Sequence, residues 1–107
     1  MKALALAALC LAGAPALASE ASDLFAKKCA TCHGDDGQGH TRMGKRFHAP
    51  DFTAAKFQAR ATDDKMRQVI QDGVYEDGVH KMPAWKDKLT AAQIDGLVQL
   101  VRSFGKR

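Results

Sequence analysis

The feature that most constrains this chain is the segment Cys29-Ala30-Thr31-Cys32-His33, in which two thiols lie three positions apart. Thiols at this spacing can form a redox disulfide, contribute half of a zinc site, or attach a prosthetic group at two points. Each option requires a different surrounding sequence and a different fold. The rest of the chain therefore has to decide between them.

Residues 1–18 have the pattern of a secretory signal peptide. Lys2 is followed by an apolar run over residues 3–11 and by the small-residue stretch Ala16-Leu17-Ala18, an order typical of a cleaved leader. The apolar run is shorter than the ~20 residues that a bilayer-spanning helix needs. We therefore expect cleavage before Ser19, export to the periplasm, and no membrane span in the mature chain.

The mature chain, residues 19–107, forms one domain too small to bury a large core unless another group fills its interior. Loss of Cys10 with the leader leaves Cys29 and Cys32 as the only thiols, and an oxidising compartment would close a free pair into a disulfide. Basic residues exceed acidic ones by four in the full chain, and by three without Lys2. This weak, scattered charge suits an acidic protein partner better than a nucleic acid.

Three stretches carry the signals of α-helices. The first covers about residues 22–31 and places both cysteines on the same side as Phe25. The second, over residues 62–73, begins with an N-capping threonine followed by two aspartates. The third, over residues 90–105, begins with a Thr-x-x-Gln capping box and ends at a glycine. We expect these helices to supply the core of the domain.

Two long segments, residues 34–61 and 74–88, separate the helices and show little strand periodicity. Loops of this length are unusual in a compact domain and are often functional. We expect them to wrap a cofactor. The prediction is an all-α fold of three to four helices with long loops around one bound group.

The flanking sequence disfavours two of the three roles for the cysteine pair. A thioredoxin-like redox pair needs alternating strands and helices around it, and this pattern is absent from the sequence. A structural zinc site needs four ligands, yet the remaining histidines lack the paired spacing of such sites. These histidines are His40, His48 and His80.

The third role requires a histidine directly after the second cysteine, and His33 is in that position. Cys-x-x-Cys-His is the attachment signature of a c-type haem, in which both thiols form thioethers and the histidine binds the iron. We therefore predict one haem c, bound covalently through Cys29 and Cys32, with His33 as an axial ligand. No catalytic residue is predicted.

Several segments extend this signature across nearly the whole mature chain. They are FAKKCATCHG over residues 25–34, APDF over 49–52, KMPAW over 81–85 and LVRSF over 100–104. In sequence and order they closely resemble the bacterial single-domain class I c-type cytochromes. The resemblance implies a helical fold in which the first and last helices cross near one haem edge, with a histidine on one side of the iron and a methionine on the other.

The second axial ligand determines much of a haem's chemistry. Met82 lies in the later loop, far enough from Cys32 to approach the opposite face, although a lone methionine more often packs in a core. Met66 fits the apolar stripe of the second helix, and Met43 lies in a basic loop. The resemblance favours Met82, because the family's Met-Pro ligand pattern falls on Met82-Pro83. Three histidines remain as rivals: His80, then His48 and His40.

The resemblance also suggests supporting roles for other residues. Pro50 matches the family's loop proline, near which a backbone carbonyl accepts the imidazole N–H of the iron ligand. Stiffening of the loop would explain this proline equally well. Phe25 is expected to meet the last helix, where the position often aromatic in the family is Leu100, so that the crossing rests on aliphatic packing or on Phe104.

Trp85 either packs on the haem face or donates its indole N–H to a propionate. Other cations are candidate propionate partners: Arg42, Lys45, Arg46 and Lys56. A further group of lysines flanks the expected haem edge and would steer an acidic redox partner toward it. This group consists of Lys27, Lys28, Lys81, Lys86 and Lys88.

These features predict a periplasmic, monomeric electron carrier with a low-spin haem c ligated by His33 and Met82, and not an enzyme. Two alternatives stay open at this point. One is a haem sensor or peroxidase-like protein with a labile sixth ligand. The other is an electron-transfer subunit of a periplasmic dehydrogenase.

Overall fold

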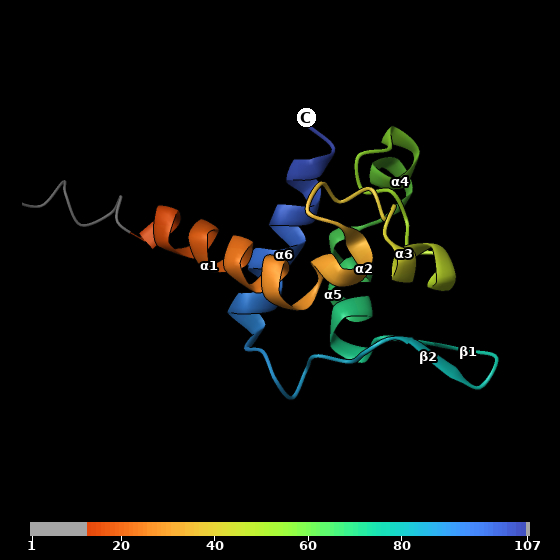
Figure 1. Ribbon diagram of the computed structural model, residues 1–107. Helices are drawn as coiled ribbons and strands as arrows, with labels where there is room; N and C mark the ends of the chain where they lie inside the picture. Colours follow the sequence, from red (N-terminus) through yellow and green to blue (C-terminus); the bar gives the residue numbers. More distant parts are fainter. Residues whose placement is uncertain (1–12, 107) are drawn as a thin grey trace, which may run out of the picture.

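The computed structural model describes residues 13–106 (Figure 1). This part of the chain is mostly helical, with one small antiparallel hairpin, as expected for an all-α cytochrome-like fold. Much of the predicted leader lies in residues 1–12, outside the described part. The elements are α1 (Gly13–Lys28), α2 (Ala30–His33), α3 (Arg42–Phe47), α4 (Ala55–Arg60), α5 (Asp63–Asp72), β1 (Val74–Glu76), β2 (Val79–Met82) and α6 (Ala91–Phe104).

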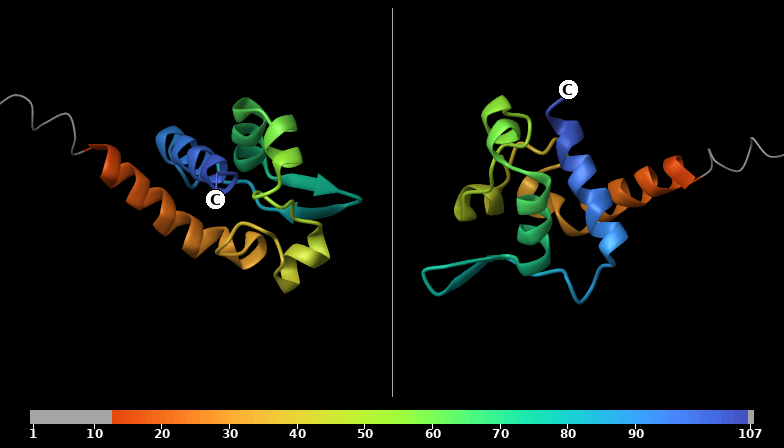
Figure 2. Two further views of the ribbon diagram at one scale, coloured as in Figure 1. Left: turned by 90° about the horizontal axis from the view of Figure 1, so that it is seen from above. Right: turned by 180° about the vertical axis from the view of Figure 1, so that it is seen from behind.

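The first and last helices, α1 and α6, cross and pack against each other (Figures 1 and 2). Ala21 is 4% exposed and faces Gly96, where an added Cβ would lie 3.5 Å from the Ala21 Cβ. One turn further along α1, the rings of Phe25 and Phe104 lie with their centroids 5.3 Å apart. The crossing therefore rests on Phe104, whereas Leu100 is only partly buried beside the core.

The core lies between α5, α6 and the loop that follows α3. Met66 and Ile70 of α5 and Phe52 of the loop are buried against the apolar face of α6. That face consists of Ile94, Leu97, Val98, Val101 and Phe104. Both predicted helix starts are confirmed: the Thr62 hydroxyl accepts from the N–H of Lys65, and Thr90 and Gln93 form the reciprocal capping box.

Arg102 of α6 ties the last helix to the segment between α4 and α5. Its guanidinium donates to the Asp63 carboxylate at 2.8 Å and to the carbonyl oxygens of Gln58 and Ala61 at 2.9 and 2.5 Å. The Gln58 amide in turn donates to the carbonyls of Phe52 and Val101. Charge-assisted bonds of this kind stabilise more than neutral ones, so this network fixes α4 over the end of α6.

The structure corrects two of the predicted elements. The expected helix over residues 22–31 is interrupted at Cys29, whose backbone departs from the helix (φ −117°, ψ −34°) and starts the separate short α2. The expected loop over residues 74–88 contains the β1–β2 hairpin, which extends away from the helices (Figure 2). Asp77 and Gly78 form its turn with positive φ angles of 53° and 75°, which an Asp-Gly pair tolerates well. No helix in residues 13–106 is both long enough and apolar enough to cross a membrane.

Candidate cofactor site

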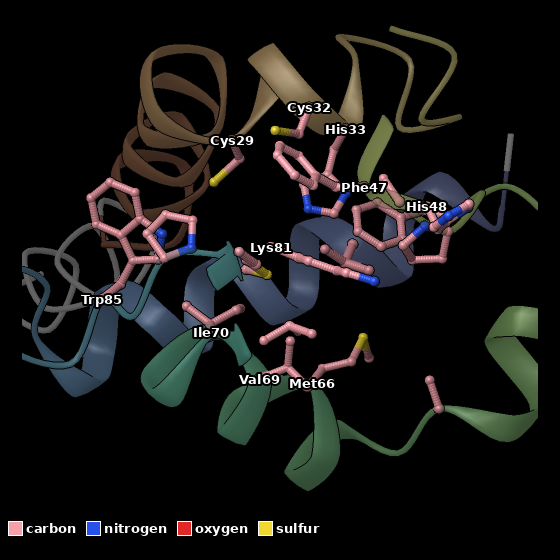
Figure 3. Close-up of a pocket in the computed structure, with 18 of the residues that line it drawn as sticks. Cys29, Cys32, His33, Phe47, His48, Met66, Val69, Ile70, Lys81 and Trp85 are labelled. Atoms are coloured by element: carbon pink, nitrogen blue, oxygen red, sulfur yellow. The ribbon is translucent and has the colours of Figure 1, made fainter. Parts of the chain in front are cut away.

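A cavity of about 380 Å³ lies between α2, α5 and the β1–β2 hairpin (Figure 3). This volume falls within the ~300–1,000 Å³ typical of cofactor and ligand pockets. Its lining is mostly apolar, with aromatic and aliphatic side chains from every surrounding element. A flat, largely apolar group would bury its faces here, which is how a small domain can gain the core that its own side chains do not supply.

One wall of the cavity carries Cys29, Cys32 and His33, which point into it together (Figure 3). The turn at Cys29 makes this possible, because its carbonyl accepts from the N–H groups of Cys32 and His33 at 3.2 and 3.0 Å. The Thr41 hydroxyl then donates to the Cys32 carbonyl at 2.6 Å and accepts from the Gly44 N–H at 2.8 Å. The short helix α2 is thus held at both ends.

The imidazole of His33 is suited to bind a metal. Its ring stacks on Phe52, with centroids 4.7 Å apart. Burial lowers the pKa of His33, which favours the neutral form that ligates metals. Its Nδ1 is buried without a hydrogen-bond partner in the described part of the chain. A buried polar nitrogen without a partner is costly, so the ring is poised for a group that the protein itself does not provide.

The two cysteines are free thiols in this structure. Burial, followed by the neighbouring Cys32, raises the pKa of Cys29 to about 11, so that this sulfur stays protonated at neutral pH. Within residues 13–106, no cluster of three or more His, Cys, Asp or Glu side chains could hold a metal ion.

The wall facing these residues comes from α5, where Met66, Val69 and Ile70 project toward the cavity (Figure 3). Met82 at the end of β2 lines the same cavity. Two thioether sulfurs are therefore available, one from the buried Met66 and one from the partly buried Met82. The residues present fit a haem: two thiols and an imidazole on one side, methionines among the remaining lining, and apolar surface between them.

Comparison with known proteins agrees with this geometry. Residues 16–101 match the family described as cytochrome c oxidase, cbb3-type, subunit III. The chain belongs to this family. It is a c-type cytochrome domain, and membership supports electron transfer as its class of function and a haem c as its cofactor.

Curated relatives of this cytochrome domain include the cbb3-type cytochrome c oxidase subunit FixPc of Rhizobium leguminosarum bv. viciae. That protein is 38% identical over 92 residues, which is 85% of this chain and 29% of the relative. Subunit CcoP of Cereibacter sphaeroides is 34% identical, covering 84% of this chain and 28% of its own length. The cytochrome domain thus spans less than a third of these relatives.

Among solved structures, the c-type cytochrome KustC0563 superposes with a TM-score of 0.71 at 33% identity. The match covers 78% of this chain and 95% of that chain. A cytochrome c fold with α1 and α6 crossing is therefore established for this chain.

The cytochrome domain brings together all four residues predicted to hold the cofactor. Cys29, Cys32, His33 and Met82 line the one cavity. Of the rival axial ligands, His48 lines it too, whereas His40, His80 and Met43 do not. Met66, explained from the sequence by the helix stripe alone, also lines the cavity, because the stripe of α5 forms its floor.

The predicted carbonyl near Pro50 does not accept a hydrogen bond from Nδ1 of His33, which has no partner among residues 13–106. Pro50 nevertheless lines the cavity. Trp85 lines it as well, with the ammonium groups of Lys28 and Lys88 lying 5.5 and 5.4 Å from its ring. No bond from its indole N–H to the protein accompanies these contacts among the described residues.

The four cations considered from the sequence as candidate propionate partners lie outside the cavity. None of the four candidates on or near α3 and α4 lines the cavity, because the cavity side of this region is formed by Phe47, His48 and Phe57 instead. The four candidates outside the cavity are Arg42, Lys45, Arg46 and Lys56. The lysines that do line it are Lys28, Lys65 and Lys81; Lys27 and Lys86, expected near the haem edge, are exposed and lie outside the lining.

Proposed function

We propose that this chain is a periplasmic one-electron carrier with a single haem c attached through Cys29 and Cys32 and ligated by His33 and Met82. The observation that carries the proposal is the convergence of two thiols, a neutral imidazole and a thioether on one apolar cavity. A bound haem supplies an iron that gains and loses one electron. The chain's own residues determine how that iron behaves.

Each thiol would tether the cofactor by adding its S–H across a vinyl group, sulfur to one carbon and hydrogen to the other, without loss of any atom. His33 would bind the iron through one ring nitrogen, and its stacking on Phe52 limits how far the ring can turn. Met82 would supply a soft ligand that favours the ferrous state and raises the reduction potential relative to a second histidine. With His33 and Met82 both holding the iron, small molecules would not reach it, which would suit a carrier and not an enzyme.

The proposed domain boundary is consistent with the contacts of α1. Its first described side-chain contacts with the rest of the fold are the Glu20–Gln93 hydrogen bond at 3.4 Å and the packing of Ala21 beside Gly96. Cleavage before Ser19 would preserve both contacts. N-terminal sequencing of the periplasmic protein tests this boundary; a chain that retains residues 1–18 contradicts it.

The family supports a second arrangement, in which the domain works while docked to a larger redox complex. The relatives are named as subunits of cbb3-type oxidases, and this chain covers 29% and 28% of their lengths. Our proposal is a separate monomer that meets an acidic partner surface only transiently. A stable complex recovered by purification from the native membrane fraction would favour the docked arrangement instead.

The assignment of Met82 can be tested against its neighbours. Met82→Ala should abolish the weak far-red sulfur-to-iron absorption band of the ferric protein and let the ferrous protein bind carbon monoxide. Met43→Ala is the matched control, since Met43 lies outside the cavity, and should keep the band. If Met66→Ala removes the band and Met82→Ala does not, Met66 is the ligand; a wild-type protein without the band would favour His48.

A further inference from the structure

The two ends of the cavity differ in chemistry. In Figure 3, Cys29 and Trp85 lie toward one end and His48 toward the other, with His33 between them. A haem carries its vinyl groups and its two propionate carboxylates on opposite edges. If the cysteines hold the vinyl edge, as the proposed function requires, the carboxylates belong at the end where His48 lies.

The position of Lys65 matches this end. Along α5, Ile70 lies below Trp85, whereas Met66 lies toward His48 (Figure 3). Lys65 precedes Met66 in the first turn of α5 and also lines the cavity. Lys65 and His48 are both exposed, so this end of the cavity is open to solvent. An ionised carboxylate lying between the apolar wall and solvent would be stabilised by a cation and a hydrogen-bond donor beside it.

The other two lysines of the cavity are already engaged. Lys81 forms an ion pair with Glu76 at 3.2 Å, so the charges of this part of the hairpin cancel. Lys28 lies 5.5 Å from the ring of Trp85, at the cysteine end. Lys65 forms no ion pair within residues 13–106, which leaves it as the uncompensated lysine of the cavity lining.

His48 occupies an unusual backbone conformation. It ends α3 in the left-handed region, with φ 60° and ψ 45°, where residues other than glycine are uncommon, although histidine, like asparagine and aspartate, adopts it more often than the rest. Asp77, the other non-glycine residue with positive φ among those described, is explained by the hairpin turn. A histidine held at this position presents a hydrogen-bond donor at the cavity that glycine would lack.

We propose that Lys65 and His48 form the binding site for the two haem carboxylates. Lys65 supplies the compensating charge and His48 a hydrogen bond, from α5 and from the end of α3 respectively. The site pairs residues that are 17 positions apart in the numbering of the chain and includes none of the cations of α3 and α4. It fixes the orientation of the cofactor in the cavity as well as its charge.

The experiment measures the midpoint potential of the haem-loaded protein as a function of pH. Lys65→Gln should move the pH-dependent step of the midpoint potential to higher pH, because loss of the cation raises the pKa of the haem carboxyl group beside it. At pH values above that step, the midpoint potential of Lys65→Gln should be lower than that of the wild type. Lys65→Arg should restore the wild-type curve, and circular dichroism checks that each variant is folded.

Lys45→Gln is the matched control, since it removes the same charge from an exposed position outside the cavity. It should leave the step in place. His48→Gly, which keeps the left-handed backbone accessible, should shift the step in the same direction as Lys65→Gln.

Identical plots of midpoint potential against pH for Lys65→Gln, Lys45→Gln and the wild type would contradict the proposed site. If the pH-dependent step of His48→Gly coincides with that of the wild type, His48 is not part of the site. Failure of the proposed function looks different: the wild type itself would then lack covalent haem, or its haem would not be low-spin.

Discussion

The imidazole of His33 stacks on the phenyl ring of Phe52, with the ring planes inclined by 20°. Phe52 is 7% exposed and also contacts Phe57 and Phe104. Phe52→Ala should lower the free energy of unfolding by about 3–5 kcal/mol, as for other large-to-small changes in a core. Urea unfolding followed by circular dichroism measures the change, with Phe52→Leu as the milder control. A loss below 1 kcal/mol would mean that this stack does not support the site.

The hydroxyl of Thr41 joins the cysteine motif to α3. Thr41→Val should cost about 2 kcal/mol, because it removes the cap of α3 and leaves the Cys32 carbonyl without this donor. Thr41→Ser keeps the hydroxyl and should recover most of the stability. Thermal unfolding of the two variants distinguishes the hydrogen bonds from the side chain's methyl contacts. A loss of stability in Thr41→Ser without one in Thr41→Val would assign the effect to the methyl group.

The ion pair between Asp63 and Arg102 makes stability depend on pH. The hydrogen bond from Arg102 lowers the pKa of Asp63 below its ordinary value. The stabilisation from this ion pair is therefore complete above the pKa that the Asp63 carboxyl group has in the unfolded chain, about 3.9. It is lost as the pH falls through the lower pKa that this group has in the folded protein. Asp63→Asn should flatten this acid limb of the stability curve, measured by urea unfolding between neutral and acid pH. Asp23→Asn, an exposed site on α1, should not flatten it.

Replacement by alanine should change the stability of the protein in opposite directions at two helical glycines. At Gly96 an added Cβ meets only the Ala21 Cβ at an ordinary 3.5 Å, so Gly96→Ala should stabilise α6 by about 0.5–1 kcal/mol. At Gly44 the same atom would collide with the backbone oxygens of Cys32 and Gly39. Gly44→Ala should cost about 1–3 kcal/mol. Denaturant midpoints of both variants check the pair, and a stabilised Gly44→Ala would contradict this packing at the motif.

Features encoded locally were predicted well. The caps at Thr62 and Thr90 depend on side chains within one helical turn, so their spacing in the sequence was enough to predict them. The Cys29 and Cys32 pair with its histidine is also a local pattern. The hairpin was missed although its signal was present: Asp77-Gly78 stands between short stretches with strand-forming residues.

Features that depend on the packing of distant segments were harder to predict. Which side of the short helix α3 faces the cavity depends on how it docks against α2, and for this reason the sequence could not predict that Lys45 and its neighbours lie outside the cavity. The role of Lys65 could not be read from its helix either, because its relation to His48 arises only in the folded chain. The same applies to Met66, which the sequence explained equally well as a core residue.

In the proposed function, the cavity holds a covalent haem with both axial positions filled by the protein. This arrangement can be tested with absorption spectra of the purified protein in its ferric and ferrous states, recorded before and after denaturation and extraction with acidified organic solvent. We predict a low-spin spectrum with the far-red sulfur-to-iron band, no change on addition of carbon monoxide, and haem that stays with the protein on extraction. Haem that is extracted, or a high-spin ferrous form that binds carbon monoxide, would contradict the account.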